Sequence, residues 1–199
     1  MKAKYIEPET LELIKKQFND EEFLPFKIAL ETGLRIGDVC RLRWRDIDCD
    51  KITVKAQKTG KIGQWRISMH LARVLALRKK MQKGKYVFPS PKDSSKPITR
   101  QAMWHRMKSR ARAILDNTDG LSPHSLRKIY AVETYRKYGF QAVKKSLQHE
   151  YANTTEIYAF ADFTTGENAN KALQRRDLDI IIRMVIDEIV SKYDVREKK

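Results

Sequence analysis

The apolar residues of this chain follow a helical spacing along most of its length and change to alternate positions in one short stretch. Between residues 51 and 56, Ile52 and Val54 alternate with polar residues, which is typical of a strand with one buried face. Residues 64–69 resemble a partner strand, and the segment KTGKIG before them supplies the glycine that a tight turn needs. Residues 44–48 can add a third strand. The pattern predicts a mostly α-helical fold with a small antiparallel three-stranded β-sheet, an α+β class.

The rest of the chain is predicted to be largely helical. Asp20 and Thr99 stand where a helix N-cap is expected, and Gly33 and Gly139 stand where a helix is expected to end. The predicted helices cover residues 8–19, 21–32, 37–42, 71–82, 100–115, 122–139, 141–147, a segment that begins at 153, and 178–192. The last helix is apolar on more than one face, so part of it needs a second surface to pack against.

The charge of the chain points to its partner. Its 199 residues include 41 Lys and Arg against 25 Asp and Glu, which gives a net charge of +16. Basic side chains gain free energy when they displace counterions from phosphates, so nucleic acid is the expected partner. The length fits one domain or two small ones.

Cysteine usage and the N-terminus indicate where the protein works. Cys40 and Cys49 lie outside any C-x-x-C pair, and no His/Cys cluster has the spacing of metal ligands. We therefore expect two reduced thiols in or near the core, no metal and no other cofactor. The N-terminus lacks the apolar region of a signal peptide, and no stretch has the length of a membrane span. These features predict a cytoplasmic protein with no membrane partner.

Six polar residues that lie far apart in the sequence carry the groups needed to cut a phosphodiester. They are Arg35, Lys58, His124, Arg127, His149 and Tyr158. A phenol can attack phosphorus and conserve the bond energy in a phosphotyrosine. Two guanidinium groups can hold the non-bridging oxygens and stabilise the charge of the transition state. His124 and Arg127 are one helical turn apart, so they are predicted to lie on the same face of their helix.

The motifs around these residues resemble the tyrosine recombinase, or phage-type integrase, family. They are G-L-R-x-G-D around Arg35, H-x-x-R at 124–127, and L-x-H followed by T-T-x-x-Y at 147–158. The resemblance extends from about Thr10 to Asp162. It implies the catalytic-domain fold of that family and a site-specific recombinase in which Tyr158 forms a 3′-phosphotyrosyl intermediate. The freed 5′-hydroxyl is then exchanged for one from another strand.

The resemblance also implies roles for the other residues. His124 would be the base-like histidine and His149 the one that contacts the phosphate. A catalytic lysine in the hairpin turn would protonate the leaving 5′-oxygen in the minor groove. Lys58 is the first candidate for it and Lys61 the alternative. Asp38 matches an acidic residue that supports the arginines, and we expect it to orient the first of them or a histidine.

Double-stranded DNA is the partner that the resemblance implies. The expected DNA contacts are basic residues of the hairpin and of the helix after residue 100: Lys55, Lys61, Arg100, Arg106, Lys108 and Arg110. Relatives carry an N-terminal helical domain that grips the other side of the DNA, whereas this chain starts almost directly at the catalytic part. We therefore expect the chain alone to bind DNA weakly and with steep salt dependence.

Two parts are expected: a catalytic domain at 1–175, and a C-terminal helix and tail at 176–199. In the resembling family such a segment docks on a neighbouring protomer of a tetramer on DNA, and the alternative is a helix folded back on its own domain. Two other functions use a similar fold: a type IB topoisomerase-like enzyme, with the same chemistry and no exchange between partners, and a non-catalytic DNA-binding relative. A basic RNA-binding protein would explain the charge and none of the motifs.

Overall fold

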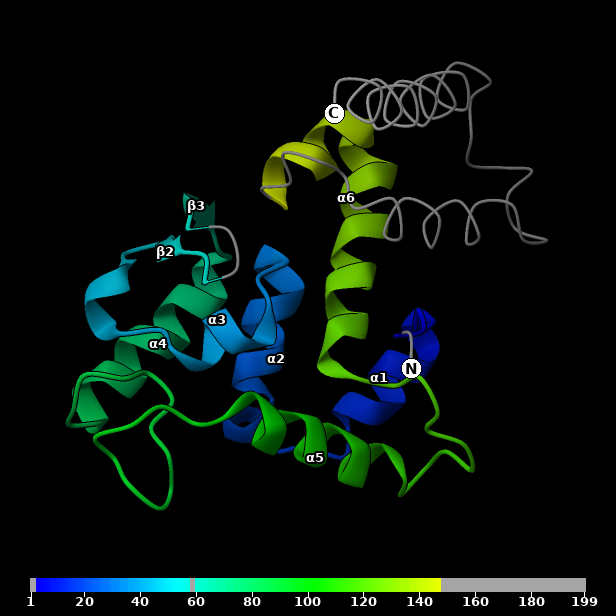
Figure 1. The fold of residues 1–199 in the computed structure, drawn as a ribbon, viewed down its shortest axis with the longest axis horizontal. Helices are drawn as coiled ribbons and strands as arrows, with labels where there is room; N and C mark the ends of the chain where they lie inside the picture. Colours follow the sequence, from blue (N-terminus) through cyan, green and yellow to red (C-terminus); the bar gives the residue numbers. More distant parts are fainter. Residues whose placement is uncertain (1–2, 58–59, 148–199) are drawn as a thin grey trace, which may run out of the picture.

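The computed structural model describes residues 3–57 and 60–147 (Figure 1). In order, its elements are α1 (Pro8–Lys15), α2 (Asp20–Thr32), α3 (Ile36–Cys40), the 3-10 helix η1 (Trp44–Asp46), β1 (Ile47–Asp48), β2 (Lys51–Lys55), β3 (Ile62–Arg66), α4 (Met69–Met81), α5 (Arg100–Ala111) and α6 (Pro123–Ser146). The three strands form one antiparallel sheet in the order β1-β2-β3. The predicted fold class, mostly helical with a small three-stranded sheet, is confirmed.

The sheet has one buried face, as the alternating residues predicted. Ile52 and Val54 of β2 are buried, whereas Thr53 and Lys55, which alternate with them, are exposed. The partner strand starts two residues earlier than predicted and ends at Arg66, because Lys55 pairs with Ile62 across a shorter turn. The helix after it also begins earlier. The Ser68 side chain accepts a hydrogen bond from the Leu71 amide and so caps α4 at Met69.

The core gathers side chains from all six α-helices of the described residues and from the sheet. Phe26 and Ile28 of α2, Leu71 of α4, Met103 of α5 and Leu126 of α6 are all fully or almost fully buried. Helix α2 packs against α6 and α3, while α5 contacts both α3 and α6. Figure 1 shows α6 standing beside α2, with α5 crossing below its first turn. The first turns of α3, α5 and α6 are thereby brought close together.

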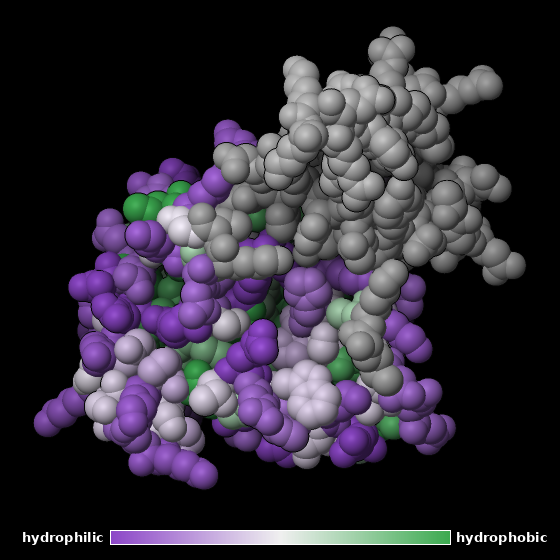
Figure 2. All heavy atoms as spheres, viewed as in Figure 1, coloured by the Kyte–Doolittle hydropathy of each residue, from purple (hydrophilic) through white to green (hydrophobic). Residues whose placement is uncertain are grey.

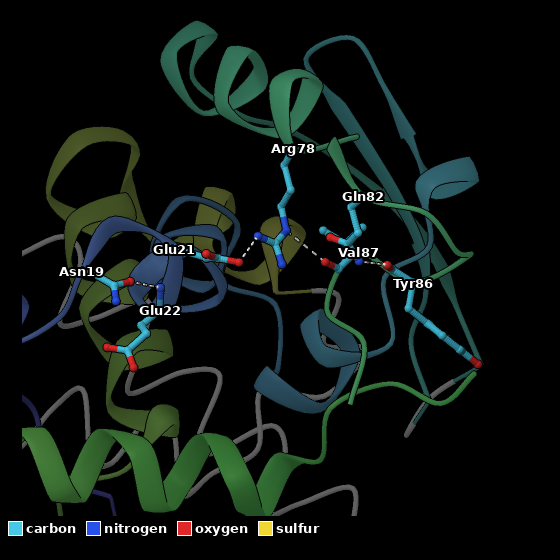
Figure 3. A network of polar contacts seen from close by, with 7 residues as sticks. All are labelled: Asn19, Glu21, Glu22, Arg78, Gln82, Tyr86 and Val87. Carbon is cyan, nitrogen blue, oxygen red and sulfur yellow. Dashed lines mark hydrogen bonds and ion pairs between the residues drawn. The ribbon is translucent and has the colours of Figure 1, made fainter. Parts of the chain in front are cut away.

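Arg78 of α4 joins two other parts of the domain (Figure 3). Its guanidinium donates to the Glu21 carboxylate of α2 at 2.6 Å and to the Val87 carbonyl at 3.2 Å. Nearby, the Gln82 side chain donates to the Tyr86 carbonyl at 3.0 Å. Charge-assisted bonds of this kind are stronger than neutral ones, so they hold the segment after α4 against α2.

Several predicted boundaries were wrong in the first helices. The first helix ends at Lys15 instead of residue 19, because Asn19 is already the N-cap of α2 and accepts a hydrogen bond from the Glu22 amide at 2.8 Å (Figure 3). Asp20, the predicted cap, is the first helical residue. Helix α3 starts one residue earlier than predicted and stops at Cys40, after which Leu42 accepts a backbone hydrogen bond from Val87.

Two later boundaries also differ from the prediction. Helix α5 begins after its predicted cap, Thr99, but ends at Ala111. The predicted break at Gly139 is absent, and α6 runs without interruption to Ser146. One glycine inside a helix costs only about 1 kcal/mol relative to alanine, which is too little to end a long helix between good helix formers. Both cysteines were predicted to lie in or near the core. Cys40 is buried, but Cys49 is exposed, so the prediction for Cys49 was wrong.

None of the helices in residues 3–57 and 60–147 combines the length and the hydropathy needed to cross a membrane. The predicted cytoplasmic location stays a prediction. The predicted helices at 153 onward and at 178–192 lie outside the described residues.

Candidate active site

A cavity of about 880 Å³ lies where the first turns of α3, α5 and α6 meet. Its lining includes a cluster of polar residues from these helices and from the start of the hairpin turn: Arg35, Asp38, Arg41, Gln57, Arg100, Gln101, Ser122, His124 and Arg127. Figure 2 shows hydrophilic residues over most of this face of the molecule and hydrophobic ones deeper in the hollow. The lining of the cavity therefore combines four arginines with apolar residues, among them Leu34, Ile36 and Pro123.

Arg35 reaches the cavity because α2 ends abruptly just before it. Gly33 has a φ of 66°, the left-handed conformation that ends a helix, and its amide still donates to the Ala29 carbonyl. A Cβ atom on Gly33 would lie 2.3 Å from the Tyr130 ring of α6. The position thus requires glycine for two reasons. The chain then turns at once into α3, with Arg35 as its half-buried N-cap residue.

Arg127 is held from two sides by main-chain carbonyl groups. Its side chain is buried, with 5% of the residue exposed. One terminal nitrogen, Nη1, donates to the Gly33 carbonyl, and the other, Nη2, donates to the Leu147 carbonyl at 3.1 Å. The guanidinium therefore links the loop before Arg35 to the end of α6. His124, one turn earlier on α6, is exposed and lines the same cavity, so the two residues share a face as the spacing predicted.

Asp38 ties α3 to the hairpin. Its carboxylate is buried and accepts hydrogen bonds from Arg41 Nη2 at 3.1 Å and from the Gln57 amide at 3.2 Å. Its partners therefore differ from the expected ones, Arg35 or a histidine. The short helix α3 places Asp38 one turn before Arg41, and Gln57 lies at the start of the turn that carries the predicted lysine.

Helix α5 contributes residues that the sequence analysis did not single out. Gln101 and Trp104 line the cavity beside Arg100. The Lys108 ammonium lies 5.1 Å from the centre of the Trp104 ring, a cation–π contact. The spacing of 100, 101, 104 and 108 marks one helical face, next to the face of buried Met103 and Met107, and could have revealed these residues. Arg41 and Gln57 had no such signal, because only tertiary packing brings them to the cavity.

The other predicted DNA-contacting residues lie at varied depths. Lys55 of β2 is exposed, Lys61 and Arg106 are half-buried, and Arg100 is exposed at the start of α5. Arg110 forms an ion pair with Glu22 of α2, in which nitrogen and oxygen are 2.7 Å apart. Their contact with DNA stays a prediction.

Three of the six predicted catalytic residues lie outside the described residues: Lys58, His149 and Tyr158. Described residues close to Lys58 and His149 in the sequence line the cavity or contact one of its lining residues. Gln57, which lines it, immediately precedes Lys58, and Leu147, which Arg127 holds, is two residues before His149.

Cys40 is the cysteine nearest in sequence to Arg35, and it is poorly suited to act as a nucleophile. Burial raises the pKa of its thiol to about 12, so the reactive thiolate is scarce at neutral pH. Within the described residues, no three His, Cys, Asp or Glu side chains gather closely enough to hold a metal ion.

The sequence model of the phage integrase family matches residues 4–164. The chain belongs to the phage integrase family. Among curated relatives, tyrosine recombinase XerD of Vibrio vulnificus is 32% identical over 157 residues, covering 70% of this chain and 50% of the relative. Tyrosine recombinase XerA of Pyrococcus furiosus is 26% identical over 153 residues, covering 74% of this chain and 51% of the relative. The chain spans about half the length of these two relatives.

Solved integrase structures share the fold at low sequence identity. A lambda integrase dimer (residues 75-356) bound to a COC′ core site superposes with a TM-score of 0.67 at 17% identity, covering 84% of this chain and 62% of that one. The lambda integrase catalytic core has a TM-score of 0.61 at 18% identity, covering 74% of this chain and 92% of that one. The fold is therefore the tyrosine recombinase catalytic-domain fold, as the motifs predicted.

Proposed function

We propose that the chain is the catalytic domain of a tyrosine-type site-specific DNA recombinase, an integrase that cuts and rejoins DNA through a 3′-phosphotyrosyl intermediate. The observation that carries this proposal is the cavity that unites Arg35, His124 and Arg127, in a family whose curated relatives are named tyrosine recombinases. In this proposal residues 1–175 form the catalytic domain.

The two arginines would hold the phosphate to be cut. Arg127 bonds one carbonyl group through each terminal nitrogen, and a guanidinium has five N–H donors in a fork that suits an oxyanion. Arg35 approaches from α3 on the other side. Two planar guanidinium groups can contact both non-bridging oxygens and stabilise the negative charge that grows as phosphorus becomes five-coordinate.

The reaction would then be a transfer between two oxygens. The phenolic oxygen of Tyr158 forms a bond to phosphorus while the bond from phosphorus to the 5′-oxygen breaks. His124 would accept the phenolic proton, and Lys58 would donate a proton to the leaving 5′-oxygen, with Lys61 as the alternative donor. His149 would contact the phosphate. Attack by a 5′-hydroxyl from another strand reverses these steps and rejoins the DNA.

Double-stranded DNA would bind across the mouth of the cavity. The net charge of +16 favours a polyanion, and lambda integrase, which shares the fold, has a solved structure bound to DNA. Arg100, Gln101 and Trp104 of α5 would contact DNA beside the cut phosphate, and Lys55 and Lys61 would contact it from the hairpin. Arg106 and Lys108 would add contacts along α5. Arg110 would have to exchange its ion pair with Glu22 for a phosphate.

Strand exchange would require several copies of the chain. A lambda integrase tetramer bound to a Holliday junction shares the fold with a TM-score of 0.64. We propose a homo-tetramer on DNA in which residues 176–199 dock on a neighbouring protomer. Recombination is favoured over a type IB topoisomerase-like activity and over a non-catalytic DNA-binding role, because the similar curated proteins are named recombinases.

Covalent trapping tests the proposal directly. A library of duplexes with a randomised centre and a nick next to each potential cut would let the short 5′-strand leave after cleavage and trap the protein on DNA. The wild-type chain is expected to form an adduct that survives denaturing gel electrophoresis, and sequencing of the bound DNA would identify the target site. Tyr158→Phe should form no adduct and bind DNA almost as well, because affinity comes mainly from phosphate contacts.

Tyr151→Phe is the matched control, since it removes a phenol seven positions earlier in the same segment. It should form the adduct at the wild-type rate. An adduct from the Tyr158→Phe chain, or none from the wild type on any duplex of the library, would show that the proposed chemistry is wrong.

A further inference from the structure

Strand β3 is hydrogen-bonded to the end of α6 by a single side chain. The Trp65 indole Nε1–H donates to the main-chain carbonyl of Ser146, with 3.0 Å between nitrogen and oxygen. Trp65 is 9% exposed and pairs with fully buried Ile52 in the neighbouring strand β2. The bond joins positions 81 residues apart in the sequence, and Ser146 is the last residue of α6.

The carbonyl groups at this helix end would otherwise lack donors. The last four carbonyls of an α-helix have no partner inside the helix. Here the Ser146 carbonyl accepts from Trp65, and the next carbonyl, of Leu147, accepts from Arg127. The chain reaches His149 two residues later. The start of the segment that carries His149 is thus fixed both by the hairpin and by the buried arginine.

The hairpin is held at a second point. At the end of β2, the Gln57 amide donates to the buried Asp38 carboxylate of α3. The turn that follows closes with two short backbone bonds, from the Gly60 amide to the Ala56 carbonyl and from the Ala56 amide to the Lys61 carbonyl, both 2.8 Å. Lys58 directly follows Gln57 in the sequence. Asp38 therefore ties the hairpin to α3, and Trp65 ties it to α6.

We propose that Trp65 is a positioning residue, which holds the hairpin carrying Lys58 in register with the end of α6 that leads to His149. The inference rests on the proposed function, because both groups must act on one phosphate. A displacement of about 1 Å in a catalytic group can cost on the order of a hundredfold in rate. The hydrogen bond from Trp65 to Ser146 joins the hairpin to the end of α6 and so limits such a displacement.

The chain offers a matched control in Trp44. It is also buried, with 8% exposed, and its Nε1–H has no hydrogen-bond partner among the described residues. Trp65→Phe and Trp44→Phe therefore remove the same atoms from buried sites, but only the first breaks a hydrogen bond. Any effect of lost ring volume alone should appear in both variants.

Hydrogen exchange followed by mass spectrometry tests the tie in the free protein. Trp65→Phe should raise amide exchange about tenfold in residues 60–66, the expected effect of losing one net hydrogen bond. A smaller increase is expected at residues 143–147, because Arg127 still holds the Leu147 carbonyl. Trp44→Phe should leave both segments unchanged. If exchange in residues 60–66 does not rise in Trp65→Phe, or rises equally in Trp44→Phe, the proposal is wrong.

Single-turnover cleavage of a trapped substrate tests the consequence. On ordinary DNA, Trp65→Phe should cleave at least tenfold more slowly than wild type and than Trp44→Phe. On DNA with sulfur at the 5′-bridging position, the leaving group needs no proton, so the rate should return to within about threefold. An equal loss on both substrates would make Trp65 merely structural and overturn its positioning role. If wild-type protein never cleaves, the proposed function fails, and the exchange result alone decides whether Trp65 ties the hairpin to α6.

Discussion

The two arginine-bearing walls of the cavity are built differently. On the α6 wall, Arg127 is buried and bound to two main-chain carbonyl groups from distant parts of the chain. On the α3 wall, Arg35 is half-buried, and its side chain forms no hydrogen bond or ion pair with another described residue. Arg127 therefore lines the cavity and also joins the segments around it, whereas Arg35 only lines the cavity. Two arginines that are proposed to hold the same phosphate therefore contribute differently to the fold.

The largest expected effect follows from removing Arg127. Arg127→Ala should lower the free energy of unfolding by about 3–5 kcal/mol, because two carbonyl groups lose a charged donor in a buried site. Arg35→Ala should change it by less than about 1 kcal/mol, the usual range for a partly exposed side chain without partners. Both variants should lose DNA cleavage. Urea unfolding followed by circular dichroism, with the nicked-duplex assay, measures the two properties separately. Equal stability of the two variants would remove the distinction between the walls.

A second prediction concerns the glycine that both walls share. Gly33 supplies the carbonyl that Arg127 binds and the turn that presents Arg35. Gly33→Ala should cost about 2–4 kcal/mol, because alanine is disfavoured at φ 66° and its Cβ would lie 2.3 Å from the Tyr130 ring.

Gly60→Ala is the control for Gly33→Ala. It has a similar φ, 69°, and nothing lies within 4 Å of its Cβ position. Gly60→Ala should lower the free energy of unfolding by about 1–2 kcal/mol, the cost of holding alanine in a left-handed backbone conformation. The difference between the two unfolding free energies isolates the contact with α6. If both substitutions cost the same, the close approach of Gly33 to Tyr130 does not constrain the site.

Two glycines also show how far the sequence could predict this fold. Gly33 and Gly139 were both predicted to end a helix, and only the first does so. At Gly33 the chain adopts a positive φ and turns into α3, whereas at Gly139 it continues in the helix. Glycine permits a stop, but tertiary packing decides whether the stop is used.

The candidate site, like the fold, could be predicted only in part from the sequence. Arg35, His124 and Arg127 were predicted from motifs, and the structure brings them to one cavity. The bonds from Gln57 to Asp38 and from Trp65 to Ser146 could not be predicted, since they join residues 19 and 81 positions apart through packing. Local patterns predicted the reactive groups, whereas the bonds that fix Arg127 and the hairpin are long-range.

The smallest expected effect comes from the α3 wall at high pH. Burial raises the pKa of the Cys40 thiol from its usual value near 9 to about 12, so the folded state keeps the thiol neutral where the unfolded chain ionises it. The contribution of Cys40 to stability is therefore complete below pH 9 and declines as the pH rises toward 12, at up to about 1.4 kcal/mol per pH unit. Between pH 8 and 10, the unfolding free energy of the wild-type protein should fall by about 1 kcal/mol more than that of Cys40→Ala.

Cys49→Ala removes an exposed thiol and should follow the wild-type curve. Urea unfolding of the three proteins across this range measures the effect, and parallel curves for Cys40→Ala and wild type would mean that the α3 wall admits water to the thiol.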